Sequence, residues 1–184
     1  MFLAGSENAK NRIKKIYGRD SQVVYPFVDL DRFKDAESFD GGYFLVLARP
    51  NKYKRVDLVQ KACNELNLEL KVVFGDLDEK AVVQVLAGCR ALIIPGIEDF
   101  GLVSLEAQAL GKPVIAFSGG GALETVIDGK TGVFFESQTV DSLKEVLKNF
   151  DPRKFNSLIC KANAQKFGKE NFIKNFKQTV ASLV

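Results

Sequence analysis

Residues 93 to 116 read Ile-Ile-Pro-Gly-Ile-Glu-Asp-Phe-Gly-Leu-Val-Ser-Leu-Glu-Ala-Gln-Ala-Leu-Gly-Lys-Pro-Val-Ile-Ala. Short apolar runs at 91–94 and 113–117 predict buried strands, and the residues between them have helical spacing. The helix is expected over 102–110, with Gly111 directly after it, where glycine commonly ends a helix. Two carboxylates have special places here: Glu98 stands where the helix begins, and Glu106 stands inside it.

Glu106 falls on the apolar side of this helix. At about 100° per residue, Glu106 lies near the middle of an arc, and Ser104 and Gln108 take the opposite side. The arc consists of Leu102, Val103, Leu105, Ala107, Ala109 and Leu110. A carboxylate in apolar surroundings is costly unless it is paired. Ligand binding is one explanation for a carboxylate at this position, and pairing with a buried cation or with backbone amides is another. Glu98 with Asp99 could equally complement the helix dipole, so geometry leaves both interpretations open.

Composition narrows the classes of function. The chain has 184 residues, 46% of them hydrophobic, which is enough for one domain with a core. A net charge of +3 does not favour nucleic acid as the main partner.

No apolar run reaches the roughly 18 residues that span a bilayer. The N-terminus also lacks the charged, apolar and small-residue order of a signal peptide, so we expect a soluble, cytoplasmic chain. The cysteines, expected to be small core residues in a reducing compartment, are Cys63, Cys89 and Cys160.

The chain contains no histidine. This excludes Ser-His-Asp and Cys-His catalysis within the chain and removes the commonest ligand of catalytic zinc. Its chemistry must therefore use carboxylates, Lys and Arg, backbone amides or a bound phosphate.

Strand and helix patterns alternate through the middle of the chain. Strands are predicted at 43–47, 70–74, 91–94, 113–117 and 132–135, with amphipathic helices between them. This order predicts an α/β fold with a doubly wound, Rossmann-like parallel sheet.

Further elements are predicted outside this core. We expect a helix over 6–18 with Ile13, Ile16 and Tyr17 inward, and a strand at 22–25. Extra C-terminal helices are expected over 139–149, 153–167 and 169–183. The last of these carries four residues at core spacing, Ile173, Phe176, Val180 and Leu183.

Ligands of such sheets bind beyond the carboxyl ends of the strands, where helix N-termini point free amides. Gly101 would let a ligand approach the backbone closely, and the amides of Gly101, Leu102 and Val103 would face an anion such as a diphosphate. Arg49 and Lys54 follow the strand at 43–47 and could grip phosphate oxygens. The alternative for Gly101 is that it only relieves steric strain in the loop. The alternative for Arg49 and Lys54 is that they belong to a solvated basic loop.

Several motifs in order resemble one family. Residues 98–116 are followed at 120–132 by Gly-Gly-Ala-Leu-Glu-Thr-Val-Ile-Asp-Gly-Lys-Thr-Gly, and together they resemble the signature of the retaining glycosyltransferases of family 4. Arg49 and Lys54 have the family's spacing. The segments 4–8 (Ala-Gly-Ser-Glu-Asn) and 25–33 (Tyr-Pro-Phe-Val-Asp-Leu-Asp-Arg-Phe) also match. The resemblance implies the GT-B fold of two Rossmann-like domains, of which this chain resembles the C-terminal, donor-binding one.

The resemblance also implies roles for single residues. Glu98 would lie at the transferred sugar as the catalytic residue, and Glu106 would bind the ribose hydroxyls. The turn that meets the sugar and the diphosphate would be Phe100, Gly101, Leu102 and Val103. Arg49 and Lys54 would neutralise the diphosphate, so that neither a cofactor nor a metal is needed. Glu124, in a glycine-rich turn, is interpreted as a structural cap.

Two departures from the family limit these expectations. The N-terminal acceptor domain is not in this sequence, so we expect one nucleotide-sugar-binding domain over 1–184, with a linking segment at 1–33 and a C-terminal helix at 168–184. Such a domain would bind the donor with little turnover alone. In addition, the helix and strand that the family usually has after residues 72–78 are predicted to be missing.

The expected partners are a nucleoside diphosphate sugar and an acceptor domain or subunit supplied elsewhere. Residues 54–57 and 121–126 resemble mannosyltransferases, which favours GDP-mannose and retaining transfer to a glycan or lipid-linked acceptor. The alternatives are a binding subunit that needs a separate acceptor chain, another GT-B enzyme such as an epimerase, and a degenerate structural domain.

A membrane contact is a further alternative. The basic residues in and next to the first helix either form a solvated face or bind peripherally to the inner face of a membrane. They are Lys10, Arg12, Lys14, Lys15 and Arg19.

Overall fold

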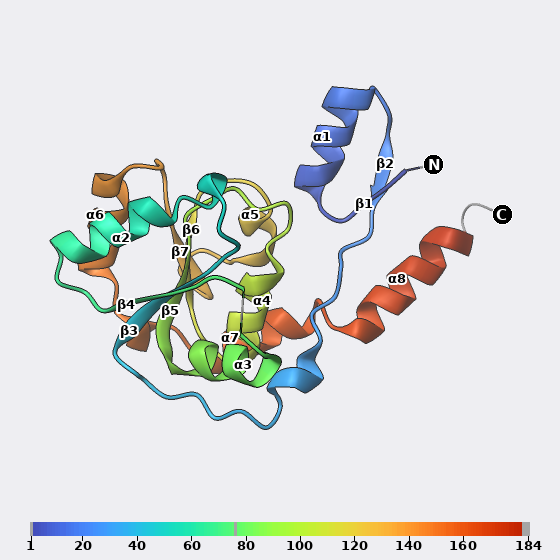
Figure 1. Cartoon of the computed structure of the whole chain (residues 1–184). Helices are drawn as coiled ribbons and strands as arrows, with labels where there is room; N and C mark the ends of the chain where they lie inside the picture. The colour runs from blue at the N-terminus through green and yellow to red at the C-terminus, as the bar shows by residue number, and fades with distance from the viewer. Residues whose placement is uncertain (1, 76, 182–184) are drawn as a thin grey trace.

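The computed structural model describes residues 2–75 and 77–181 of the chain. At its centre lies a five-stranded parallel sheet in the order β4-β3-β5-β6-β7 (Figure 1). Its strands are β3 (Tyr43–Leu47), β4 (Leu70–Val73), β5 (Cys89–Ile94), β6 (Val114–Phe117) and β7 (Gly132–Phe135). All five predicted core strands are present, and the prediction of an α/β fold with a doubly wound parallel sheet is confirmed.

Helices cover both faces of this sheet. On one face lie α2 (Val56–Glu65) and α6 (Val140–Asn149), which contact each other. On the other lie α3 (Glu79–Gly88) and α4 (Leu102–Ala109), and α7 (Ser157–Gln165) packs against α4.

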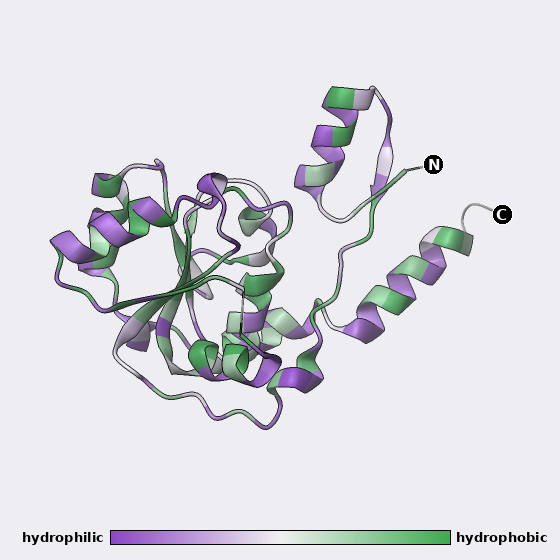
Figure 2. Cartoon of the chain, in the orientation of Figure 1, coloured by the Kyte–Doolittle hydropathy of each residue, from purple (hydrophilic) through white to green (hydrophobic). Residues whose placement is uncertain are grey.

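Alternate residues of a strand serve opposite faces. In β5, Leu92 and Ile94 join the apolar cluster under α3 and α4, whereas Ala91 and Ile93 join the cluster under α2 and α6. The central strands are accordingly almost uniformly hydrophobic in Figure 2, as expected of parallel strands buried on both sides. The three cysteines are buried and unpaired, which confirms their interpretation as core residues.

The winding of the sheet reverses between β3 and β5. From β3 the chain crosses to β4 at one edge and then returns to β5 on the other side of β3. The loops after these two strands, residues 48–55 and 95–101, therefore open beside each other at the carboxyl edge of the sheet. Between β4 and α3 the described residues 74, 75, 77 and 78 form no helix or strand, as predicted.

The burial of α4 differs from the prediction. Ser104 and Gln108, expected on the side away from the core, are fully buried, while Leu102 is exposed. The reason is that α4 lies between the sheet and α7, so that both of its sides are covered. Its polar residues are matched there: Gln108 Nε2 donates to the carbonyl of Thr125 over 2.9 Å, and Asn163 Nδ2 donates to Gln108 Oε1 over 2.8 Å.

Residues at the N-terminal end form a small unit beside the main sheet (Figure 1). β1 (Phe2–Ala4) and β2 (Ser21–Val23) pair in parallel, and α1 (Glu7–Tyr17) connects them. The helix has the predicted ends, with Ser6 accepting a hydrogen bond from the N–H of Ala9 and Gly18 in a left-handed conformation. β1 was not predicted.

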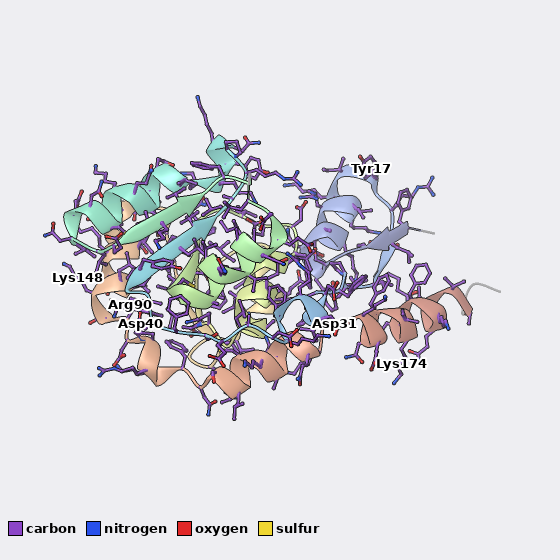
Figure 3. All side chains as sticks on the ribbon, turned by 60° about the horizontal axis from the view of Figure 1, so that its bottom comes forward. Tyr17, Asp31, Asp40, Arg90, Lys148 and Lys174 are labelled. Atoms are coloured by element: carbon purple, nitrogen blue, oxygen red, sulfur yellow. The ribbon has the colours of Figure 1, made fainter. Side chains whose placement is uncertain are left out.

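The predicted inner face of α1 is wrong, because α1 has no buried residue and Ile16 and Tyr17 are 63% and 67% exposed. Tyr17 lies on the outer surface in Figure 3.

The C-terminal helices are also partly corrected. In place of one helix over 153–167, a 3-10 turn, η3 (Pro152–Lys154), precedes α7, whose N-terminus is capped by Asn156. α8 (Lys169–Ala181) is present, but its apolar stripe of Ile173, Phe176 and Val180 is exposed rather than part of the core, and Leu183 lies outside the described residues. Figure 2 shows this alternation of apolar and polar turns along α8. Among the described helices, none is long and apolar enough to cross a membrane.

Glu124 ties the small unit to the main sheet. Its carboxylate, on α5 (Ala122–Thr125), accepts hydrogen bonds from the backbone N–H groups of Glu7 over 2.7 Å and Asn8 over 3.0 Å. The prediction of a structural cap is confirmed, with the difference that Glu124 caps α1 rather than its own helix.

Two glycines pack directly on the loop that follows β5. Gly120 forms an isolated β-bridge with Glu98, and the N–H of Gly121 donates to the carbonyl of Glu98 over 2.8 Å. A Cβ at Gly121 would lie 2.3 Å from Cα of Phe100, and a Cβ at Gly120 would lie 2.6 Å from the carbonyl oxygen of Glu98. The glycine run is therefore a backbone contact that fixes the loop, and its interpretation as a simple turn was incomplete.

Gly121→Ala tests this contact. Because a Cβ would overlap backbone rather than a flexible side chain, we expect the free energy of unfolding to fall by about 1–3 kcal/mol in urea titrations. Gly5→Ala is the matched control, since a Cβ there meets only Pro26 Cδ at 3.7 Å, and it should change stability by less than about 0.5 kcal/mol. Equal stability of the two variants would contradict the assigned contact.

Candidate functional site

A cleft of about 680 Å³ opens where the loops after β3 and β5 meet. Its lining residues are Arg32, Leu47, Ala48, Arg49, Tyr53, Lys54, Gly75, Val82, Glu98, Leu102, Val103 and Glu106. A neighbouring hollow of about 520 Å³ shares Lys54 and Glu98 with this cleft and adds Phe100 and Gly101. The structure thus brings all eight sequence-predicted site residues to one connected surface.

The N-terminus of α4 points into this surface. Gly101 precedes the helix with φ 93° and ψ 51°, a left-handed conformation that favours glycine, and no side chain caps the helix among the described residues. The first amides of a helix have no partner within the helix. Those of Gly101, Leu102 and Val103 are therefore available to an anion, and the helix dipole favours negative charge at the same place.

Lys54 and Glu98 form an ion pair at the centre of the site. Lys54 Nζ lies 2.5 Å from Glu98 Oε1, and the two side chains are only 16% and 18% exposed. Lys54 ends a 3-10 turn, η2 (Lys52–Lys54), in the loop after β3. A Cβ at Gly96 would lie 2.7 Å from the carbonyl oxygen of Tyr53, so the two loops are in close contact. Both groups of the pair are positioned by backbone that cannot shift freely.

Glu106 lies further along α4, on the wall of the cleft. Arg32 Nη1 lies 3.0 Å from Glu106 Oε1, with side-chain exposures of 25% and 19%. Burial raises the pKa of the Glu106 carboxyl, and the charge of Arg32 acts in the opposite direction. The structure therefore supplies the buried cation that the sequence left as one explanation for Glu106. It does not remove the other explanation, since the same carboxylate lines the cleft.

Arg32 is a site residue that the sequence analysis missed. It lies on η1 (Leu30–Phe33), whose N-terminus is capped by Asp29. It belongs to the family-like segment 25–33, yet its partner Glu106 is 74 residues away. No periodicity or local spacing relates two positions so far apart.

Asp99 does not simply complement the helix dipole. Its carboxylate pairs with Arg12 of α1, and the hydrogen bond from Arg12 lowers the pKa of Asp99. Ser6 Oγ donates to the carbonyl of Asp99 over 2.6 Å. Two further basic residues of α1 pair with carboxylates, Lys10 with Glu7 at 3.1 Å and Lys14 with Asp20 at 2.8 Å. Much of the basic face of α1 is thus already matched by acidic groups of the chain.

Arg49 is the remaining cation of the cleft that the sequence predicted. It is exposed just after β3, and within the described residues it makes no hydrogen bond or ion pair. Its guanidinium is therefore free to bind an incoming anion in bidentate fashion.

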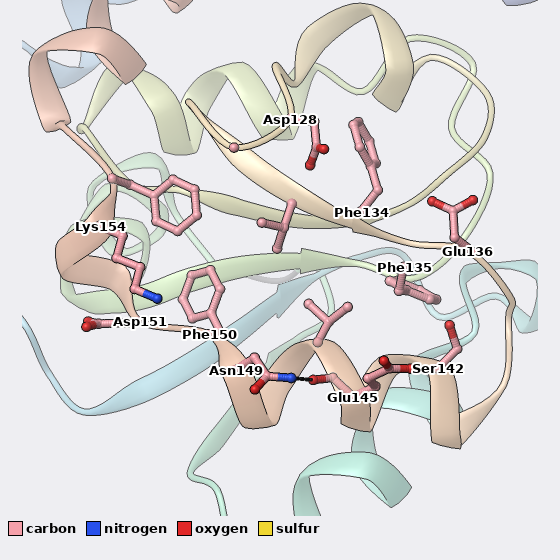
Figure 4. A pocket seen from close by; sticks show the side chains of 14 residues that line it. Asp128, Phe134, Phe135, Glu136, Ser142, Glu145, Asn149, Phe150, Asp151 and Lys154 are labelled. Atoms are coloured by element: carbon pink, nitrogen blue, oxygen red, sulfur yellow. Dashed lines mark hydrogen bonds between the residues drawn. The ribbon is translucent and has the colours of Figure 1, made fainter.

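A second cavity differs from the cleft in the charge of its lining residues. About 570 Å³ in volume, it lies beside β7, α6 and η3 (Figure 4). Its charged lining residues are one lysine, Lys154, and four carboxylates, those of Asp128, Glu136, Glu145 and Asp151. A diphosphate would be repelled there, so the cleft between the loops after β3 and β5 is the better anion site.

Comparisons with known proteins show which family the chain belongs to. Residues 64–166 match the family model described as glycosyl transferases group 1. An alpha-1,3/1,6-mannosyltransferase of Dictyostelium discoideum is 44% identical over 96 residues, covering 51% of this chain and 22% of that protein. An uncharacterised glycosyltransferase of Methanocaldococcus jannaschii is 28% identical over 198 aligned residues, covering 96% of this chain and 56% of that protein.

A solved structure has the same fold as nearly the whole chain. Anabaena HepE in complex with UDP and glucose superimposes with a TM-score of 0.77 at 20% identity, covering 98% of this chain and 62% of HepE. The chain thus spans about half, or less, of the length of the curated relatives named above. It belongs to the group 1 glycosyl transferases, family 4 of the glycosyltransferases, and has the fold of the C-terminal half of a GT-B enzyme.

Proposed function

We propose that the chain is the donor-binding half of a retaining glycosyltransferase, and that it binds a nucleoside diphosphate sugar in the cleft between the loops after β3 and β5. The observation that carries this proposal is the convergence of the free N-terminus of α4 with Arg49 and Lys54 at the switch point of the sheet. Two cations and a helix N-terminus together form a site for a diphosphate.

Each part of the nucleotide sugar has a matching group. The diphosphate would lie between Arg49, Lys54 and the amides of the first turn of α4. Glu106 would accept hydrogen bonds from the ribose hydroxyls. Glu98, at the border of the neighbouring hollow, would lie at the sugar, while Phe100 and Gly101 would shape the turn that the sugar meets.

The cations would also support the chemical step. As the bond from the anomeric carbon to the diphosphate breaks, negative charge develops on the leaving oxygen, and fixed cations with helix amides stabilise it. In a retaining transfer the acceptor oxygen replaces the diphosphate on the same face of the sugar, and the proton of the acceptor hydroxyl passes to the departing diphosphate oxygen. This chemistry uses groups that a chain without histidine possesses.

The acceptor would be held by a further domain or subunit. β1 and β2 form a sheet of only two parallel strands, with Phe2 and Leu3 exposed, and α8 presents the exposed stripe of Ile173, Phe176 and Val180. Parallel strands are normally covered on both faces, and contiguous exposed apolar residues mark interaction sites. We therefore expect the chain alone to bind the donor and to transfer little sugar.

Glu106→Gln and Glu98→Gln should separate the two carboxylates. Glu106→Gln should weaken binding of a nucleoside diphosphate about ten- to a hundredfold by calorimetry, because charged hydrogen bonds to the ribose are lost. Glu98→Gln should leave this binding unchanged or tighter, because it frees Lys54 from its ion pair. In a two-domain enzyme the Glu98 change should instead lower turnover. Equal loss of affinity in both variants, with equally lowered melting temperatures, would count against these roles.

The donor is proposed to be GDP-mannose. This rests on the likeness of residues 54–57 and 121–126 to mannosyltransferases and on the mannosyltransferases among the relatives. We expect saturation-transfer NMR with GDP, UDP and ADP to give the strongest transfer to GDP. Preferential binding of UDP, the nucleotide bound by HepE, would exclude the mannose donor while leaving the donor-binding role intact.

A further inference from the structure

Arg32 stands between two carboxylates at the wall of the cleft. Besides Glu106 at 3.0 Å, its Nε lies 3.5 Å from Glu79 Oε1 on α3, and its guanidinium carbon lies 5.3 Å from the centre of the Phe33 ring. Glu106 is on α4, whereas Arg32 belongs to the segment between β2 and β3. The guanidinium therefore donates a hydrogen bond to a carboxylate of α4 and faces a second, exposed carboxylate on α3, while its buried Nε has no hydrogen-bond partner among the described residues.

The backbone that carries Arg32 is itself fixed. Phe33 is buried in the apolar cluster under α3 and α4, and the N–H of Asp31 donates to Asp29 Oδ1 over 3.2 Å. The N–H of Val28 donates to the carbonyl of Phe167 over 2.9 Å. The anchored backbone therefore fixes the point from which the Arg32 side chain reaches Glu106.

Glu106 needs such a partner to stay charged in the cleft. Its neighbours in the cleft wall include the apolar Val82, Leu102 and Val103, and burial disfavours its carboxylate form. The nearby Glu79 adds to this effect. The other charged groups that line the cleft are Arg49, Lys54 and Glu98, and Lys54 is engaged by Glu98. Arg32 is thus the cation that is hydrogen-bonded to Glu106 in the described part of the chain.

The ion pair of Arg32 with Glu106 leaves one oxygen of the Glu106 carboxylate available to a ligand. Arg32 binds Oε1 of Glu106, and within the described residues Oε2 has no hydrogen bond. A carboxylate held through one oxygen can accept from a ligand through the other.

We infer that Arg32 is a positioning residue for nucleotide recognition, which holds Glu106 charged and turned so that its free oxygen accepts from the vicinal hydroxyls of a ribose. This rests on the proposed function of Glu106. Arg32 itself need not touch the nucleotide. The competing interpretation is that Arg32 only fastens the segment between β2 and β3 to α4.

Ribose analogues distinguish the two interpretations. The affinities of a ribonucleoside diphosphate and of its 2′,3′-dideoxy counterpart are measured by calorimetry for the wild-type chain, Arg32→Gln and Arg32→Lys. We expect Arg32→Gln to weaken ribonucleotide binding about ten- to a hundredfold, to leave dideoxynucleotide binding within about twofold, and Arg32→Lys to restore part of the preference for ribose. The matched control is Arg153→Gln, which removes an exposed arginine paired with Asp151 at 2.9 Å and should change neither affinity.

The pH dependence gives a second readout. Without Arg32, whose charge lowers the pKa of Glu106, the Glu106 carboxyl should bind its proton at higher pH, so ribonucleotide affinity should fall earlier as the pH is lowered than in the wild-type chain. The dideoxynucleotide carries the same phosphates, and its profile should be alike in both proteins.

Other outcomes identify which idea fails. If Glu106→Gln keeps the full preference for ribose, the role proposed for Glu106 is wrong. If Glu106→Gln loses that preference but Arg32→Gln keeps it, only the inference about Arg32 is overturned. Equal loss of both ligands in Arg32→Gln, with a lowered melting temperature and no change in the pH profile, would show that Arg32 is a structural fastener alone.

Discussion

The site depends on a backbone contact between the loop after β5 and Gly120–Gly121. There is no room for a side chain at this contact, since a Cβ at Gly121 would lie 2.3 Å from Cα of Phe100. The contact fixes Glu98, and with it the left-handed turn at Gly101 that starts α4. Everything else in the site is arranged around this loop. Lys54 reaches Glu98 from the neighbouring loop, and α4 carries Glu106 along the cleft. Asp99 is bound by Arg12 of α1 and by Ser6, which caps that helix.

Charge in this site is organised as two ion pairs. Lys54 with Glu98 and Arg32 with Glu106 hold two cations and two carboxylates near the mouth of one cleft. Buried ion pairs are rarely an efficient means of stabilising a fold, because desolvation offsets much of their attraction. Their clustering beside a free helix N-terminus and the exposed Arg49 supports the proposed binding of an anion that also offers hydroxyl groups. A nucleoside diphosphate sugar has both properties.

The core of the fold was predictable because its signals are local. β3 and β7 begin and end at the predicted residues, since short apolar runs bounded by turn residues define a strand buried on both faces. The faces of α4, α1 and α8 were not predicted correctly. An apolar arc does not reveal that α7 also covers α4, burying Gln108 in a hydrogen-bonded network, nor that α1 and α8 turn apolar residues outward. Within the site, the helical pattern made the placement of Glu98 and Glu106 unusual, but it left their roles open, and the proposed roles came from the resemblance to the family. Arg32 was missed because only the tertiary fold joins it to Glu106.

The claim that this chain binds a nucleoside diphosphate in the cleft is tested most directly by amide chemical-shift mapping. Spectra of the ¹⁵N-labelled chain are recorded as GDP, UDP or ADP is added. We expect saturable shifts at the amides of Gly101, Leu102 and Val103 and in the loop from Arg49 to Lys54, with smaller changes around Arg32. Shifts confined to the acidic cavity beside β7, or no shifts with any of the three nucleotides, would contradict it.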